Sequence, residues 1–150
     1  MKRFSWRVRT PDLNPDNNAP VKTETSADAD EGNTKTDVVA NTFDGAWLHF
    51  ETVDFGSKAP NYFSVRYSGK DNCYDDAYVE VRRGSVNGEI IATVKTPPTG
   101  AWDKYATAGV YLTAEQQAKL TGEQDLYMVL RGTRSSGKKY VGNFNWMQFS

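Results

Sequence analysis

The stretch "AYVEVRRGSVNGEIIATVK", residues 77–95, decides the fold class. Its first part alternates in polarity and places Val79 and Val81 on one face, as a half-buried strand requires. The Asn87–Gly88 pair that follows is the strongest short signal for a hairpin turn. The apolar run after the turn predicts the return strand. Residues 77–95 are therefore predicted to form an antiparallel β-hairpin.

Alternation with a period of two recurs outside this hairpin. In "AWLHFE", residues 46–51, Leu48 and Phe50 are predicted to face the core, and Trp47 to face away from it. "QDLYMVLR", residues 124–131, is apolar on both faces, which is typical of a central strand between two layers. Further strands are predicted over residues 62–68 and 145–149. Many short strands with frequent turn signals indicate an all-β, antiparallel β-sandwich.

Two segments depart from the strand pattern. Residues 10–37 are rich in Pro, Asn, Asp, Thr and Gly without a sustained period, which predicts a long irregular N-terminal segment. Residues 113–122 are predicted to contain one short helical turn. Thr113 and Gln116 have the spacing of a capping box at its start, and Gly122 is expected to end it.

Length and charge restrict the domain organisation and the partners. The 150 residues fit a single domain, with a first strand and loop over about residues 1–20 and the main core over residues 21–149. The net charge of −1 provides no basic surface, so neither nucleic acid nor an anionic membrane is expected as a partner. No apolar run approaches the roughly 18 residues of a membrane helix, and none follows "MKRFSWRV" as in a signal peptide.

Few residues carry reactive chemistry, whereas aromatic residues are frequent. Cys73 is the single cysteine, which excludes an intrachain disulfide, and His49 is the single histidine, which excludes a histidine metal cluster. Four tryptophans stand in an otherwise polar chain. Trp102 follows a Pro-Pro-Thr-Gly turn that should bring the chain to the surface. From composition alone, the ordinary explanation of Trp102 is a core residue that caps the end of the sandwich.

Four segments together resemble a known family. "FDGAWLHFETVDFG", "VEVRRGSVNGEIIATVKTPPTGAWDKY", "TGEQDLYMVLRG" and "GNFNWMQF" are similar, in order and spacing, to family 6 carbohydrate-binding modules. The resemblance extends over residues 21–149. It implies a β-sandwich of jelly-roll type that binds carbohydrate without catalysis and that secreted polysaccharide-degrading enzymes carry.

The resemblance implies a binding site at the loop end of the sandwich. Trp102 would stack on a sugar ring, the amide of Asn143 would bond to sugar hydroxyls, and Glu24 would accept from paired hydroxyls. The family's second aromatic position falls on Asn41, and Phe43 is the alternative source of that missing ring. From the residues alone, Asn143 fits a turn residue and Glu24 a solvated charge equally well.

A second binding region is implied on a sheet face. Trp47 matches the tryptophan with which some family members bind an extended polysaccharide there. The alternation of residues 46–51 independently directs Trp47 away from the core. The alternative for Trp47 is a position under a loop or against a partner domain.

No cofactor is expected, because the family's calcium site is predicted to be lost. The resemblance places Arg7, Arg9 and Asn145 at positions where many members have acidic ligands. Calcium needs six to eight oxygen ligands, several of them charged, and guanidinium groups repel it. The acidic runs at residues 28–32 and 71–76 leave open a calcium site elsewhere.

The predicted function is a non-catalytic module that holds a parent glycoside hydrolase on a plant or algal cell-wall polysaccharide, xylan or β-glucan. The partners would be that glycan and a catalytic domain in cis, and the module is expected to be a secreted monomer. The alternative is a small β-sandwich glycosidase or polysaccharide lyase, but none of the 19 acidic residues stands out as a catalytic pair. A protein-binding sandwich would instead predict a broad exposed apolar patch.

Overall fold

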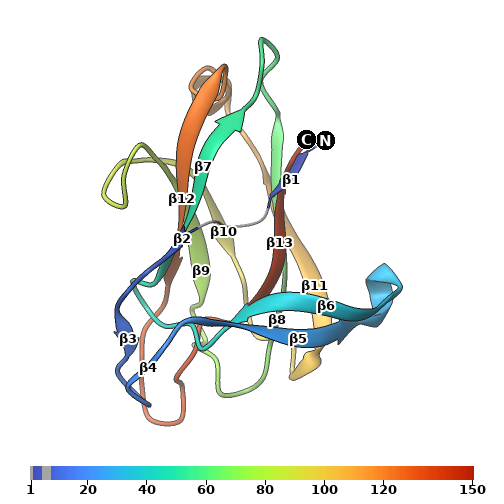
Figure 1. Ribbon diagram of the computed structural model, residues 1–150, viewed down its shortest axis with the longest axis vertical. Helices are drawn as coiled ribbons and strands as arrows, with labels where there is room; N and C mark the ends of the chain where they lie inside the picture. Colours follow the sequence, from blue (N-terminus) through green and yellow to red (C-terminus); the bar gives the residue numbers. More distant parts are fainter. Residues whose placement is uncertain (1, 5–7) are drawn as a thin grey trace.

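Two antiparallel sheets form a β-sandwich in the computed structural model, which describes residues 2–4 and 8–150, and the side chains from residue 9 onward (Figure 1). This confirms the predicted fold class, an antiparallel sandwich of jelly-roll type. Among the described residues, neither the α-helix nor the 3-10 turn is long enough to cross a membrane.

The two sheets differ in how their strands are ordered. The five-stranded sheet has the order β10-β9-β12-β7-β2. Its strands are β2 Val8–Arg9, β7 Trp47–Asp54, β9 Tyr78–Arg83, β10 Glu89–Lys95 and β12 Glu123–Arg131. The six-stranded sheet has the order β11-β8-β13-β6-β5, with β1 also pairing with β13. Its strands are β1 Lys2–Phe4, β5 Lys22–Asp28, β6 Asn33–Ala40, β8 Tyr62–Gly69, β11 Ala101–Tyr111 and β13 Asn143–Phe149. The short strands β3 Leu13–Asn14 and β4 Ala19–Pro20 pair with each other.

The core is built by the inward-facing residues of alternating strands. Leu48 of β7, Val79 and Val81 of β9, and Val65 of β8 are fully buried in one apolar cluster. Strand β12 pairs with β9 on one side and with β7 on the other, which confirms the predicted central strand at residues 124–131. The period-two pattern therefore placed the core residues correctly.

The hairpin of residues 77–95 forms as predicted, but its turn differs from a two-residue Asn-Gly turn. Strands β9 and β10 pair in register from Arg83↔Glu89, so five residues connect them. The left-handed residue of this connection is Gly84, with φ 85°, whereas Asn87 is not left-handed. Gly88 is needed for a different reason: a Cβ there would lie 1.9 Å from the carbonyl oxygen of Arg83.

The short helix forms where the capping pattern predicts it and ends earlier than expected. Helix α1 spans Ala114–Gln117, and Thr113 and Gln116 form the reciprocal capping box. The helix ends at Ala118, four residues before Gly122. The amide of Gly122 instead donates to the carbonyl of Gly56, 2.7 Å away, and thereby fixes the chain at the start of β12.

The prediction of an irregular segment over residues 10–37 is wrong for most of its length. Strands β5 and β6 form a long hairpin whose tip is the 3-10 turn η1, Ala29–Glu31. Polar side chains dominate β5 because it is an edge strand with mostly exposed residues. Its backbone pairing and a few polar anchors therefore hold the hairpin in place, and an apolar period is not required.

The tip of this hairpin is anchored on β8, over which it passes in Figure 1. The buried guanidinium of Arg66 donates from Nε and Nη2 to the two carboxylate oxygens of Asp28, at 2.8 and 2.7 Å. These hydrogen bonds hold the pKa of Asp28 below its ordinary value. The indole of Trp146 adds a hydrogen bond of 3.0 Å to Glu31. The tip of the β5–β6 hairpin is thus fixed to side chains of β8 and β13, in the same sheet.

Both ends of the described chain lie at the same end of β13. Lys2 of β1 pairs with Phe149, and Ser150 exchanges backbone hydrogen bonds with Tyr62. Figure 1 shows the N and C labels side by side. The opposite end of β13 begins at Asn143, among the loops described next.

Candidate functional site

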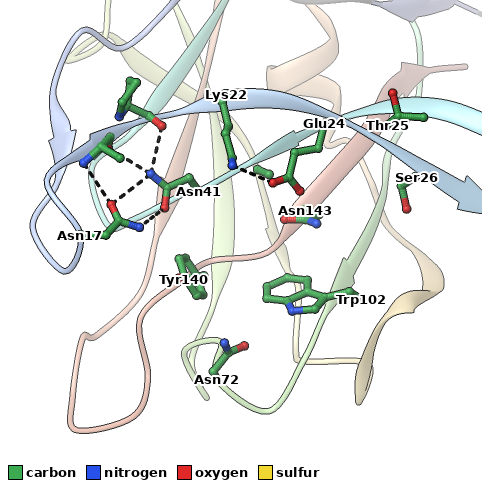
Figure 2. Close-up of a pocket in the computed structure, with 13 residues that line it drawn as sticks. Asn17, Lys22, Glu24, Thr25, Ser26, Asn41, Asn72, Trp102, Tyr140 and Asn143 are labelled. Atoms are coloured by element: carbon green, nitrogen blue, oxygen red, sulfur yellow. Dashed lines mark hydrogen bonds and ion pairs between the residues drawn. The ribbon is translucent and has the colours of Figure 1, made fainter.

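An open pocket of ≈ 500 Å³ lies between the β5–β6 hairpin and the loops at one end of the sandwich (Figure 2). This volume is in the range of small-molecule binding sites. The pocket is lined by Asn17, Ala19, Pro20, Lys22, Glu24, Thr25, Ser26, Ala40, Asn41, Asn72, Trp102, Tyr140 and Asn143. Trp102, Asn143, Glu24 and Asn41, four residues selected from the sequence, therefore line one pocket.

Two aromatic rings meet at a corner of this pocket. Trp102 lies near the start of β11, and Tyr140 belongs to the loop before β13. Their ring centroids are 5.8 Å apart and their planes are inclined by 70°. The two rings are too steeply inclined to sandwich a sugar between parallel faces. Instead, one pyranose can stack on one ring while the other ring borders it at the side.

The turn before Trp102 is held by hydrogen bonds to β8, which keep the indole at the surface. Gly100 has φ 104°, in the left-handed region that favours glycine. The hydroxyl of Thr99 accepts from the amide of Gly69, at 3.1 Å, and contacts the carbonyl of Lys104 at 2.6 Å. Trp102 is therefore partly exposed because the turn is tied to β8, and it is not a buried cap of the core.

Asn143 is placed to offer its amide to a ligand. It is the first residue of β13, pairs with Ser68 of β8 and is 8% exposed. Among the described residues, no other group bonds to its side-chain amide. An amide provides two donors and an acceptor, which match adjacent sugar hydroxyls.

A charged pair occupies the β5 side of the pocket. Lys22 and Glu24 are two residues apart on one strand, so their side chains project from the same face. The ammonium Nζ and the carboxylate Oε1 are 3.0 Å apart. Both side chains remain about half exposed, at 56% and 43%.

Asn41 lines the pocket, but its side chain is used to hold the β3–β4 strands. Its Nδ2 donates to the carbonyls of Ala19 and Pro20, both at 3.0 Å. Its Oδ1 accepts from Asn17 at 2.6 Å and from the buried Asn14 at 3.3 Å. Its φ of 57° is one that asparagine tolerates better than most residues. Asn41 therefore builds a wall of the pocket.

Phe43 does not supply the missing ring. It is 6% exposed, belongs to the apolar core and does not line the pocket. Between it and Asn41 lies Thr42, whose hydroxyl donates to the carbonyl of Gly142 and accepts from the amides of Val141 and Gly142. Residues 41 and 42 thus position two different walls of the same pocket.

Sequence reasoning selected four of the 13 lining residues and missed the other nine, among them Lys22, Asn17, Asn72 and Tyr140. Asn17 and Asn72 stand in polar loops and give no local signal. Tyr140 had one: it is an aromatic residue in the run "SSGKKYVG", which has no strand period that would bury it. A ring in such a loop suggests a contact with something outside the core.

The second predicted region, around Trp47, lies on the outer face of the five-stranded sheet. Trp47 is partly exposed and contacts Tyr127 edge-on, with ring centroids 5.6 Å apart. His49 stacks on the same Tyr127 at 4.1 Å. On the next strand, Glu80 pairs with Arg82 at 2.8 Å. These aromatic and charged groups lie on three neighbouring strands of that sheet, β7, β12 and β9.

The strand order excludes Arg66 from that surface, although it shares the outward parity of Trp47 along its own strand. Arg66 lies on β8 of the other sheet and is used in the anchor to Asp28. Strand order, which alternation in the sequence does not provide, decides which outward residues meet.

The loss of the family's calcium site stays a prediction. Arg7 lies outside the described residues, and Arg9 donates to Thr23 at 3.2 Å. Asn145 bonds to Thr36 and to Asp28, at 3.0 and 3.2 Å. Within the described part of the chain, no group of three His, Cys, Asp or Glu residues could hold a metal ion.

The geometry agrees with comparisons to known proteins. The family model "Carbohydrate binding module (family 6)" matches residues 14–150. A β-1,3-glucan-binding module from Bacillus halodurans is 23% identical with a TM-score of 0.74, and the match covers 99% of this chain and 94% of that one. A family 6 module from Clostridium cellulolyticum, solved with xylose, is 25% identical with a TM-score of 0.67, covering 87% and 88%.

A third similar structure is a larger enzyme. It is an arabinoxylan arabinofuranohydrolase of glycoside hydrolase family 43 from Bacillus subtilis, solved with cellotetraose. The match is 21% identical with a TM-score of 0.69 and covers 86% of this chain but 24% of that one. The match to the family model over most of the chain, together with the fold, establishes the class: this protein belongs to family 6 of the carbohydrate-binding modules and is a non-catalytic binding module.

Proposed function

We propose that the pocket at Trp102 binds a xylan or β-glucan chain of plant or algal cell walls and so holds a parent glycoside hydrolase on its substrate. The observation that carries this proposal is the convergence of Trp102, Tyr140 and the unengaged amide of Asn143 in one open pocket. The similar modules solved with xylose, or named for β-1,3-glucan, support the two polysaccharide classes.

The chemistry of a pyranose fits this arrangement. Its ring has an apolar face of axial C–H groups, which an indole face covers, and an equator of hydroxyls that need polar partners. Asn143 would supply donors and an acceptor, and the pair Lys22 and Glu24 a further donor and acceptor. We expect modest affinity, roughly millimolar to micromolar or about −4 to −8 kcal/mol, because few rings are engaged and each bound hydroxyl gives up water.

Modest affinity is sufficient for a module that is joined to an enzyme. Binding of the module raises the local concentration of the linked catalytic domain at the polysaccharide without tighter contacts. The similar enzyme from Bacillus subtilis, of which the matched region is about a quarter, supports a catalytic domain in cis. In this role the protein works as an extracellular monomer.

The test compares three alanine variants in retention on insoluble xylan and β-1,3-glucan and in calorimetry with the matching oligosaccharides. Trp102→Ala should weaken binding by roughly 10- to 100-fold, because one ring face of burial contributes about 1.5–3 kcal/mol. Trp47→Ala reports whether the sheet face contributes. Tyr111→Ala is the matched control, because this ring is 76% exposed and lies outside both regions.

The assignment of the pocket would be refuted if Trp102→Ala bound as well as the parent. Glycan binding by either region would be refuted if Trp47→Ala also bound as well as the parent. A reducing-sugar assay on the same polymers checks the class independently. Retention without new reducing ends is the expected outcome, and new ends would instead indicate a glycosidase.

A further inference from the structure

The charges inside the pocket cancel. Among the described residues that line it, only Lys22 and Glu24 carry a formal charge, and they face each other at 3.0 Å (Figure 2). The remaining lining groups are amides, hydroxyls, two aromatic rings, alanines and a proline. The pocket therefore presents a donor and an acceptor of full charge, but no net charge.

Both members of the pair are open to a ligand. Their side chains are 56% and 43% exposed, and the strand that carries them is held by backbone pairing and by the distant anchor at Asp28. An ion pair this exposed contributes little to folding stability.

We infer that the Lys22–Glu24 pair restricts this pocket to neutral saccharides and that Glu24 rejects sugars bearing a carboxylate or a sulfate. The inference rests on the proposed function, because it assigns the ligand class of that same pocket. A neutral ring can accept a charge-assisted hydrogen bond from Lys22 and donate one to Glu24. An anionic group brought to the Lys22 ammonium lies within a few ångströms of the Glu24 carboxylate, so attraction and repulsion nearly cancel.

Because attraction and repulsion cancel, the binding free energy of the anionic sugar is left with an uncompensated cost. This cost arises because the charged group gives up part of its hydration on entry. Removing one member of the pair should therefore change the selectivity in a direction set by the charge that remains. Glu24→Gln leaves a net positive pocket, and Lys22→Gln leaves a net negative one. The quantity that reports this is the ratio of the affinities for an anionic and a neutral sugar of equal size.

The expected change in this ratio is about five-fold for each variant. Two unit charges about 4 Å apart in water interact by about 1 kcal/mol, which is about five-fold in a dissociation constant. Glu24→Gln should raise the ratio of anionic to neutral affinity by this factor, and Lys22→Gln should lower it. The two variants should thus differ by roughly 25-fold at low salt, and high salt should reduce the difference by screening.

Matched probes isolate the charge. One pair is a xylo-oligosaccharide bearing one glucuronic acid and the same molecule with its carboxyl reduced to an alcohol. The other pair is a β-1,3-gluco-oligosaccharide and its derivative oxidised to a uronate at C6. Calorimetry with both pairs is carried out on the parent, the two glutamine variants and the charge-conserving controls Lys22→Arg and Glu24→Asp, whose ratios should stay within about two-fold of the parent.

The outcomes separate this inference from the function on which it rests. Opposite shifts in the two glutamine variants, with unchanged ratios in the controls, support it. A parent that prefers the uronate probe, or glutamine variants that still bind the neutral probe at an unchanged ratio, would overturn it and leave the glycan site intact. If the parent binds neither neutral probe, the proposed function fails first, and the inference fails with it.

Discussion

Replacement of Thr42 by valine tests how the pocket is positioned. Thr42 is fully buried, and its hydroxyl donates to the carbonyl of Gly142 at 2.6 Å. The same oxygen accepts from the amides of Val141 and Gly142, at 3.2 and 3.0 Å. These two residues separate Tyr140 from Asn143 in the chain. Valine has nearly the shape of threonine but lacks the hydroxyl, so the substitution removes all three hydrogen bonds without leaving a cavity.

The expected cost follows from the groups that lose their partner. Each buried backbone group without a hydrogen bond costs about 1–3 kcal/mol, and relaxation of the loop relieves part of the total. We expect Thr42→Val to lower the free energy of unfolding by about 2–4 kcal/mol. For a chain of this size, that is a fall of about 5–15 °C in the melting temperature.

The assay combines urea unfolding with a binding measurement. In this way an effect on the placement of Tyr140 and Asn143 is separated from an effect on the stability of the fold. Binding is measured well below the melting temperature of the variant, where the chain is folded. There, displacement of Tyr140 and Asn143 should weaken oligosaccharide binding by about ten-fold. Thr42→Ser keeps the hydroxyl and loses a methyl group, so it should bind like the parent although it is about 1 kcal/mol less stable.

Two results would refute this reasoning. A valine variant as stable as the parent would show that the hydroxyl is not needed by the buried amides. A valine variant that is destabilised but binds normally would show that another contact positions Tyr140 and Asn143.

Three other predictions concern residues around the pocket. Hydrogen bonds from Arg66 lower the pKa of Asp28 in the folded state. The contribution of Asp28 to stability is therefore complete above about pH 5. It is lost as the pH falls through the pKa of the unfolded state, near 3.9, towards the lower pKa of the folded state. Urea unfolding should accordingly show a steeper loss of stability from pH 6 to pH 3 in the parent than in Asp28→Asn. Burial raises the pKa of Cys73 to about 12, so an aromatic disulfide reagent at pH 8 should label the thiol, followed by absorbance, only after denaturation. Asn41→Ala should cost about 2–4 kcal/mol in the same unfolding assay, because a left-handed alanine is strained and the buried Asn14 loses its partner.

The strands that were predictable are those whose pattern reflects burial on one face. Val79 and Val81 face the core because alternate side chains of a strand point to opposite sides. The capping box at Thr113 was predictable because its two hydrogen bonds depend on residues three apart. In each case the deciding interaction is local in the sequence.

The β5–β6 hairpin was missed because its stability is not local. It carries few apolar residues, and its tip is held by Asp28 on Arg66, 38 residues apart in the chain. A carboxylate in a polar run looks the same whether it is solvated or paired with a buried guanidinium. The polar composition that suggested a loop belongs here to an exposed edge strand.

The pocket was partly predictable. The two errors, the choice of Phe43 as the second ring and the omission of Tyr140, have one cause, which is that the deciding contacts join distant parts of the chain. Trp102 and Asn143 both line the pocket because the ends of β11 and β13 hold them there. Asn41 stands at the family's second aromatic position. Its amide instead bonds to residues 14–20, which only the folded chain brings near. Tyr140 could replace the absent ring because the loop before β13 reaches the same corner from the other side.

Strand β13 also fixes how the module is oriented relative to anything joined to it. Its first residue lines the pocket and its last pairs with Lys2, so both ends of the described chain lie at the pole opposite the pocket, about 20 Å away along the strand. A domain attached there starts out on the side of the module away from this pocket. The end-to-end span of a flexible linker is about 5–6 Å times the square root of the number of its residues. A linker of roughly 16 residues therefore covers the length of β13 and lets the attached domain reach the pocket.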